Sequence, residues 1–306
     1  MPNKSTADSQ EAEIDKTLVM EPPPPTLEQL LSLDQMTRNQ FSCAQHQTNR
    51  NNTLYGGQLI GQALAATQAT VANLRPHTMQ LCFQSPSSAS KAVRYRVEDT
   101  LDSRSFSTRS VVALQDATIL QGIASFCGEE PGYEHAQAWH AEPPQPETLP
   151  TLEQLMRDYG ARVGEHGSGR LRCYPQIDVR PIDAEQHLLL TPGPACCRFW
   201  IRALLPADAN DALRYAALAF LSDYLLVNAA LIPHVTQLPA RRLFVASLNH
   251  TLRFHQPCDP SDWLLYETHS PWAHGGRALI QGRFYTRNGM LIASTAQEAL
   301  IRQMAK

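Results

Sequence analysis

The sequence predicts an α+β fold made of two tandem repeats, each a long helix wrapped by an antiparallel sheet. Each half of the chain holds one long, almost uniformly apolar segment of helical length, at residues 56–70 and 211–226. In each half, segments typical of strands follow that helix, and two of them are joined by a short polar turn, at residues 115–117 and 287–289. The same order of elements therefore occurs twice.

The composition along the chain suggests where the repeats begin and end. Residues 1–25 are polar and close with four prolines, which predicts a mobile N-terminal arm. Residues 26–135 contain the first repeat, and residues 171–306 contain the second. Between them, residues 136–170 carry many Pro, Glu and Gly residues, so we interpret them as a linker that packs on the outside.

The first repeat is expected to start with a short helix over residues 27–31, because the Thr26 hydroxyl can accept a hydrogen bond from the first turn. The apolar helix from Gly56 to about Thr70 follows. Alternation of apolar and polar residues then predicts strands, at residues 93–98, 107–114 and 119–126.

The linker contains one helical pattern, at residues 152–159. In the second repeat, a strand over residues 197–202 precedes the long apolar helix over residues 211–226. Four further strands complete this repeat, at residues 243–254, 263–269, 277–287 and 291–301.

The two halves can be aligned without a gap at an offset of 172 residues, the separation of Asp116 and Asn288 in the two turns. The same offset places Ser125 of the first half at the position of Gln297 in the second. We therefore expect the two repeats to differ chemically, with one active site per chain, built on the second repeat.

Length, charge and cysteine content exclude several functional classes. A chain of 306 residues that is 43% hydrophobic can bury a large core. A net charge of −3 provides no broad basic surface, so neither nucleic acid nor an anionic membrane is an expected partner. Seven cysteines, never spaced as C-x-x-C, are typical of reduced thiols in an intracellular protein, and no metal or cofactor is expected.

Three polar residues within apolar segments of the second half are the candidate catalytic residues: Asp223, Ser247 and Gln297. A carboxylate among apolar residues is costly unless it is paired or used. A base, a hydroxyl and an amide can together hold and polarise one water molecule. The alternatives are structural, since Asp223 could cap a turn, Ser247 could be an ordinary strand residue and Gln297 could face solvent.

With their neighbours, these three residues resemble the Asp, Thr or Ser, and Gln set of the acyl-CoA thioesterase II family. The resemblance covers roughly residues 26–303 and rests on several motifs in the right order. These motifs lie at residues 54–64, 105–109, 124–126, 250–255, 263–266, 282–286 and 293–298.

The resemblance implies two hotdog folds in one chain and the hydrolysis of acyl-CoA thioesters to free acid and coenzyme A. Asp223 would then activate a water that Ser247 and Gln297 hold, without a covalent intermediate; the chain has no G-x-S-x-G motif. Gly56 and Gly57 are candidate substrate-binding residues, because backbone N–H groups at a helix start can meet a thioester carbonyl. Tight packing of that helix start is the alternative.

The chain also departs from the family pattern. In the second half, Asn249 replaces a usual Asp. In the first half, Gln80 replaces a common His and residues 83–87 differ from the usual segment, and these first-half changes imply altered substrate choice. Two other functions stay open: a hotdog enzyme for a specialised or carrier-bound acyl thioester, and a non-catalytic acyl-binding protein. His250 and His255 are expected to be hydrogen-bonded structural residues rather than metal ligands.

Partners and location follow in part from the resemblance. Because relatives assemble further, we expect a homo-oligomer. The chain has no signal-peptide pattern and no apolar stretch of about 18 residues that could span a membrane. Some relatives are peroxisomal, but residues 303–306 are not of the S-K-L type, so a cytoplasmic location is expected.

Overall fold

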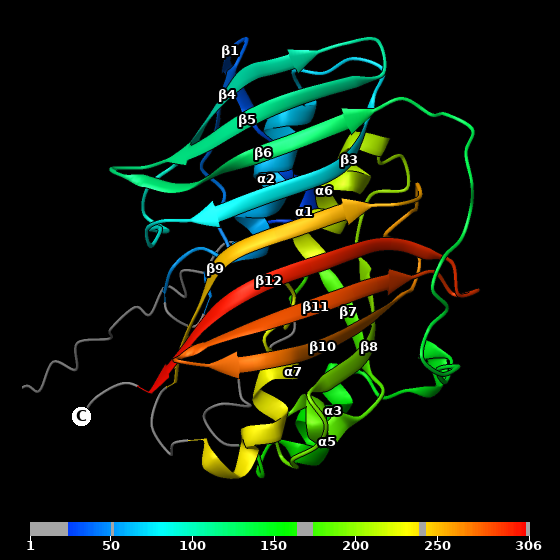
Figure 1. The fold of residues 1–306 in the computed structure, drawn as a ribbon. Coiled ribbons are helices and arrows are strands. Elements are labelled where there is room, and N and C mark those ends of the chain that lie inside the picture. Colours follow the sequence, from blue (N-terminus) through cyan, green and yellow to red (C-terminus); the bar gives the residue numbers. More distant parts are fainter. Residues whose placement is uncertain (1–23, 50–51, 164–173, 239–242, 304–306) are drawn as a thin grey trace, which may run out of the picture.

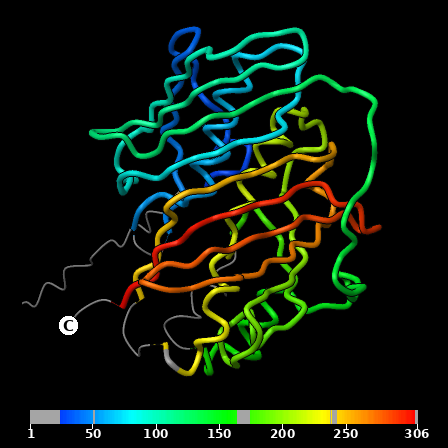
Figure 2. Tube along the Cα trace, in the orientation of Figure 1, coloured from blue at the N-terminus to red at the C-terminus, as the bar shows by residue number. Residues whose placement is uncertain are grey.

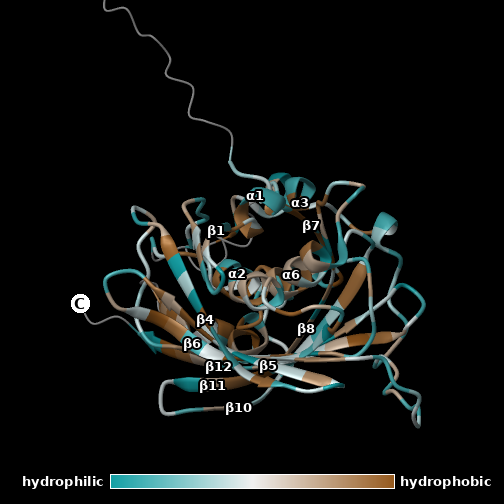
Figure 3. Ribbon diagram, turned by 90° about the horizontal axis from the view of Figure 1, so that it is seen from above, coloured by the Kyte–Doolittle hydropathy of each residue, from teal (hydrophilic) through white to brown (hydrophobic). Residues whose placement is uncertain are grey.

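The computed structural model describes residues 24–49, 52–163, 174–238 and 243–303. Within these residues, twelve strands form one antiparallel sheet in the order β1-β2-β4-β5-β6-β3-β9-β12-β11-β10-β8-β7 (Figure 1). The sheet curves around two helices, α2 and α6, which lie side by side in its concave face (Figure 3). The architecture confirms the predicted pair of tandem hotdog folds.

The first repeat starts with α1 (Leu27–Leu31), which Thr26 caps as predicted; the structure adds a reciprocal capping box between Thr26 and Gln29. The long helix α2 (Gly56–Gln68) is buried over most of its surface. The strands are β1 (Asp34–Thr37), β2 (Gln40–Cys43), β3 (Arg75–Phe83), β4 (Val93–Asp102), β5 (Phe106–Leu114) and β6 (Thr118–Cys127). The predicted strands β4, β5 and β6 are confirmed, whereas β1, β2 and β3 were not predicted.

The chain then crosses to the second repeat through a segment that holds η1 (Pro146–Thr148) and the predicted helix α3 (Leu152–Tyr159). Figure 2 shows this green segment running down one side of the molecule. The indole N–H of Trp200 donates to the Pro144 carbonyl at 2.8 Å, and Trp139 packs on the same aromatic cluster. This segment therefore covers part of the outer face of the second repeat.

The second repeat has the same plan as the first, a long helix wrapped by an antiparallel sheet, with additional short helices. Its helices are α5 (Ala184–His187), α6 (Asp211–Leu221), α7 (Asn228–Leu231) and the 3-10 helix η2 (Ile232–Gln237). Its strands are β7 (Ile177–Pro181), β8 (Cys196–Ala203), β9 (Leu243–Phe254), β10 (Leu264–His274), β11 (Arg277–Tyr285) and β12 (Leu291–Gln303). All five strands predicted for this half are present, and β7 was missed.

Helix α6 is shorter than the sequence predicts, because it ends at Leu221 rather than at residue 226. The Tyr266 hydroxyl donates to the Ser222 carbonyl oxygen at 2.6 Å and occupies an acceptor that a continuing helix would use. Leu225 then adopts a φ of +48°, which ends right-handed helical geometry. Asp223 consequently lies in a tight turn after α6 and not within a helix.

Strand pairing and helix packing both join the repeats. Strand β3 pairs antiparallel with β9, with Met79 opposite Leu252 and Leu81 opposite His250, so the two sheets become one. Helix α2 packs against α6 closely enough that a Cβ on Gly61 would lie 2.8 Å from the Ala216 carbonyl oxygen. The end of α6 is thereby held beside the start of α2.

The alignment of the two halves without a gap, at an offset of 172 residues, is wrong by one residue in the strands of the β5–β6 and β11–β12 hairpins. Five residues, 286–290, separate the innermost pair of the β11–β12 hairpin, but only three, 115–117, separate that of β5–β6. Because strand side chains alternate between faces, this difference changes which residues correspond. The buried pair Ile280–Gln297 matches Arg109–Ala124, and Ser125 lies on the outer face instead.

Candidate active site

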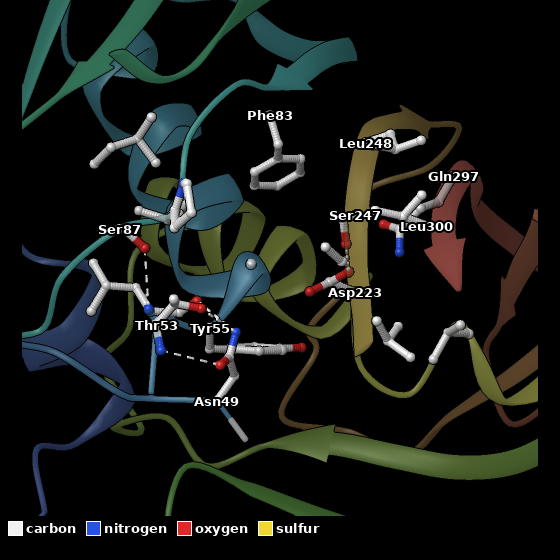
Figure 4. Close-up of a pocket in the computed structure, with 18 of the residues that line it drawn as sticks. Asn49, Thr53, Tyr55, Phe83, Ser87, Asp223, Ser247, Leu248, Gln297 and Leu300 are labelled. Carbon is white, nitrogen blue, oxygen red and sulfur yellow. Dashed lines mark hydrogen bonds between the residues drawn. The ribbon is translucent and has the colours of Figure 1, made fainter. Parts of the chain in front are cut away.

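A cavity of about 430 Å³ opens where the start of α2, the turn after α6, the first part of β9 and strand β12 meet. All three predicted catalytic residues line it. Figure 4 shows Asp223, Ser247 and Gln297 gathered on one side of the cavity, with Phe83 across from them. The structure thus brings together side chains from three separate segments of the second repeat.

Asp223 is half-buried, and the donors around it stabilise its charged form. The Ser247 hydroxyl lies 3.5 Å from Oδ1, and the Gln297 carboxamide also donates to the carboxylate. The backbone N–H of Gly57, at the start of α2, provides a further hydrogen bond. None of these contacts is a hydrogen bond by which the Asp223 side chain would cap a following turn.

Burial raises the pKa of the Asp223 carboxyl from an ordinary 3.8 to about 7. The hydrogen bonds from Gln297, Gly57 and Ser247 act in the opposite direction but do not cancel the effect of burial. A carboxylate with a pKa near neutrality can accept a proton from water far more readily than an ordinary Asp. The site therefore holds a potential general base.

A β-bulge turns Ser247 toward the cavity. In a regular strand Ser247 would face away from the buried His250, three residues further on. In β9, however, Asn249 pairs with Glu298 and Ser247 with Ala299, so Leu248 is the extra residue. The Asn249 Oδ1 accepts the Glu298 N–H at 3.1 Å, a role that the Asp usual in the family could also fill.

Gln297 is buried and held from its other side by His250. The Nδ1 atom of His250 lies 2.7 Å from Gln297 Oε1, and its Nε2 lies 2.9 Å from the Ser222 hydroxyl. Burial lowers the pKa of His250 to about 4, so the imidazole is neutral near pH 7. The solvent-facing alternative for Gln297 is therefore wrong.

Gly56 and Gly57 are required by close packing as well as being near the site. A Cβ on Gly56 would lie 2.6 Å from Asp223 Oδ2, and one on Gly57 would meet the Phe220 carbonyl oxygen and the Tyr55 ring. The Tyr55 hydroxyl donates to that same Phe220 carbonyl at 3.2 Å, which is a structural role. Tight packing of the helix start is thus confirmed, and substrate binding by Gly56 and Gly57 stays a prediction.

The remaining wall of the cavity is mostly apolar. Phe83, Gln84 and the residues up to Ser87, the segment in which the sequence departs from the family, all line it. The apolar side chains that complete the wall include Leu54, Leu59, Ile119, Leu226, Val227, Phe244 and Leu300. A long apolar group can enter here without losing hydrogen bonds.

The other histidine noted in the sequence, His255, bonds the Ser294 hydroxyl at 2.6 Å on the surface and is not part of the cavity. Among the described residues, no three His, Cys, Asp or Glu side chains gather in a group suited to a metal ion. Nor does any helix in that part of the chain have the length and apolar character needed to cross a membrane.

Family models match both halves of the chain. Residues 45–127 match a model described as the acyl-CoA thioesterase N-terminal domain, and residues 137–301 match one described as the C-terminal domain. The chain belongs to the acyl-CoA thioesterase family. Membership in this family makes it a thioester hydrolase by class.

Named relatives agree with this assignment. Acyl-coenzyme A thioesterase 8 from Rattus norvegicus is 31% identical over 283 residues, which is 89% of this chain and 88% of the relative. Acyl-CoA thioesterase 2 from Haemophilus influenzae is 30% identical over 251 residues, covering 81% of this chain and 87% of that protein. The whole double repeat is therefore shared with these thioesterases.

Solved structures show the same fold. The acyl-CoA thioesterase II TesB2 from Mycobacterium marinum superimposes with a TM-score of 0.72 at 31% identity, covering 91% of this chain and 98% of that one. A hot dog fold protein from Alicyclobacillus acidocaldarius gives a TM-score of 0.70 at 17% identity and supports the fold alone.

Proposed function

We propose that this family member hydrolyses acyl-CoA thioesters to a free carboxylic acid and coenzyme A, with Asp223 as the general base. The observation that supports this most directly is the half-buried Asp223 carboxylate, which lies beside Ser247 and Gln297 at the wall of an apolar cavity. The named relatives supply the substrate class, since both are acyl-CoA thioesterases.

The reaction requires one positioned water and no covalent intermediate. Asp223 accepts a proton from the water as its oxygen attacks the thioester carbonyl carbon. The Ser247 hydroxyl and the Gln297 carboxamide keep the water at the base, which turns a bimolecular step into an effectively unimolecular one. Collapse of the tetrahedral intermediate then breaks the C–S bond and releases the thiolate.

The leaving group needs little assistance, because a thiol with a pKa of about 8.5 departs readily as the thiolate. The developing oxyanion needs donors more urgently. We assign this role to the backbone at the start of α2, where Gly56 lines the cavity beside Asp223. The Gly57 N–H contributes by orienting Asp223.

The apolar wall, from Leu54 on one side to Leu300 on the other, would take the acyl chain. Because the segment from Phe83 to Ser87 lines the same cavity, its departure from the family pattern would alter which chain fits. This observation also favours a second candidate, hydrolysis of a specialised or carrier-bound acyl thioester at the same site.

The test is release of free thiol from a panel of acyl-CoA substrates that runs from short to long chains, with Asp223→Asn as the matched inactive control. We expect thiol release from at least one chain length and loss of it in the variant. The same acyl groups on an acyl carrier protein test the second candidate. Release of thiol from neither series would contradict the proposal.

A further inference from the structure

We propose that His250 is a positioning residue that fixes the orientation of the Gln297 carboxamide, turning its oxygen away from Asp223 and its NH2 group toward it. The inference rests on the function proposed above, because it assigns a role at the same site. His250 does not line the cavity and acts only through Gln297.

The contacts around His250 leave little freedom. The side chain is fully buried, with Nδ1 2.7 Å from Gln297 Oε1 and Nε2 2.9 Å from the Ser222 hydroxyl. The opposite side of Gln297 faces the Asp223 carboxylate. Gln297 thus lies between an imidazole and a carboxylate, and its two polar ends are chemically different.

Charge complementarity decides which end points where. An ionised carboxylate only accepts hydrogen bonds, so it requires the NH2 group of Gln297. The carboxamide oxygen must then accept from Nδ1, which places the single proton of the neutral imidazole on that atom. The Ser222 hydroxyl lies 2.7 Å from the Ala219 carbonyl oxygen and 2.9 Å from Nε2, and it completes the arrangement when its single proton turns to Nε2.

The same network reaches the general base along the chain. Ser222 directly precedes Asp223, and the Tyr266 hydroxyl holds its carbonyl oxygen at 2.6 Å. His250 therefore contacts both the residue before the base and the amide that faces the base. Without the imidazole, the carboxamide could rotate and turn its oxygen toward the carboxylate, which would displace the bound water.

The first repeat shows that the fold itself does not demand this histidine. At the corresponding positions of β3 and β6, Met79 and Ala124 pair across the sheet, and both are fully buried. The polar pair His250–Gln297 replaces an apolar one in the second repeat only. Burying this polar pair costs free energy, and we attribute its presence to a role at the active site rather than to packing of the core.

Two substitutions separate the two contacts of His250. Asn carries its amide nitrogen on Cγ, as His carries Nδ1, so His250→Asn can still donate to Gln297. Gln carries its amide on Cδ, so His250→Gln reaches toward Ser222 and loses the Nδ1 donor. His250→Ala removes both contacts, and melting curves for all three report how far each fold is weakened.

We expect His250→Ala and His250→Gln to lower kcat about 10–100-fold with KM within about threefold of wild type. His250→Asn should recover most of kcat. In a Gln297→Ala background, His250→Ala should cost less than about twofold more, because the residue acts through the lost amide. His77→Asn, at a half-buried histidine of the first repeat bonded to Ser125 at 2.9 Å, is the matched control and should leave kcat unchanged.

The inference is overturned if His250→Gln is as active as His250→Asn, or if the losses from His250→Ala and Gln297→Ala are additive. A wild-type enzyme without activity would instead count against the proposed function. An active enzyme whose Gln297→Ala variant keeps its kcat would overturn both the role of Gln297 and that of His250.

Discussion

The two repeats place different chemistry at corresponding positions of the same sheet. In the first repeat, the buried pair Met79–Ala124 is apolar, and in the second the pair His250–Gln297 is polar. Two apolar residues satisfy the core with no further requirement, whereas a buried imidazole and amide need partners on every side. The second repeat provides those partners in Ser222 and Asp223, and we therefore propose that the water-activating site lies in this repeat.

The ends of the two central helices show the same contrast. Two residues past α2, the Thr70 hydroxyl accepts from Arg109, which is only 3% exposed and pairs with Asp99 and Asp102. Two residues past α6, Asp223 has donors but no cationic partner among its interactions. A paired cluster stabilises the fold, while an unpaired carboxylate with a raised pKa is available for proton transfer.

The largest expected effect is the loss of the base itself. Asp223→Asn should lower kcat by about 10²–10⁴-fold, because Asn cannot accept a proton from water. Thr70→Val, at the matching position of the first repeat, should leave kcat within about twofold, so thiol-release kinetics of both variants measure the contrast directly. If Thr70→Val lowered kcat as much as Asp223→Asn does, the ends of the two helices would not differ in function as we propose.

Gln297→Ala should have the next largest effect, with kcat reduced about 10–100-fold and KM changed far less. Ser125→Ala should leave both constants unchanged, since that hydroxyl lies on the outer face and bonds His77 and Thr108. If steady-state kinetics showed that Ser125→Ala lowers kcat more than Gln297→Ala does, the chemistry would lie in the first repeat.

The pH dependence of kcat/KM tests the state of the base. Because Asp223 must be ionised, kcat/KM should rise with pH through about 7, the pKa that burial gives this carboxyl. Ser247→Ala removes a donor that lowers this pKa, so the rise should move to higher pH. A profile that is flat between about pH 5 and 9 would remove Asp223 from the role of base.

A smaller effect concerns stability. The folded-state pKa of Asp223 lies above its ordinary value, so the stability linked to its proton is present below about pH 4 and is lost as pH rises through about 7. Asp223→Asn avoids this loss, and after allowance for solvent screening we expect about 1–2 kcal/mol of extra stability at about pH 8. Melting temperatures should therefore favour the variant at high pH, whereas equal melting temperatures at both ends of the range would contradict the raised pKa.

Self-association does not distinguish the two repeats and is the least specific prediction. We expect the chain to form a homo-oligomer, and light scattering at micromolar concentration measures its mass. A monomer at all concentrations would show that the pairing of β3 with β9 within one chain suffices for the fold.

The sequence by itself determined the order of the two long helices and of eight of the twelve strands that the structure describes, because local patterns report on local structure. The cap at Thr26, the helix over residues 152–159 and five of the six described strands of the second repeat follow from short-range spacing and are confirmed. The three polar residues among apolar neighbours were also visible in the sequence, since the cost of burying them is a local property.

Only the tertiary structure decided how these residues meet. The end of α6 depends on Tyr266, which lies 44 residues further along the chain. The direction in which the Ser247 side chain points depends on a β-bulge in β9. The residue of the first repeat that corresponds to Gln297 depends on a difference of two residues between the two hairpin turns. The register of strand pairing and long-range hydrogen bonds determine these features. The alternation of apolar and polar residues within a single strand does not contain this information.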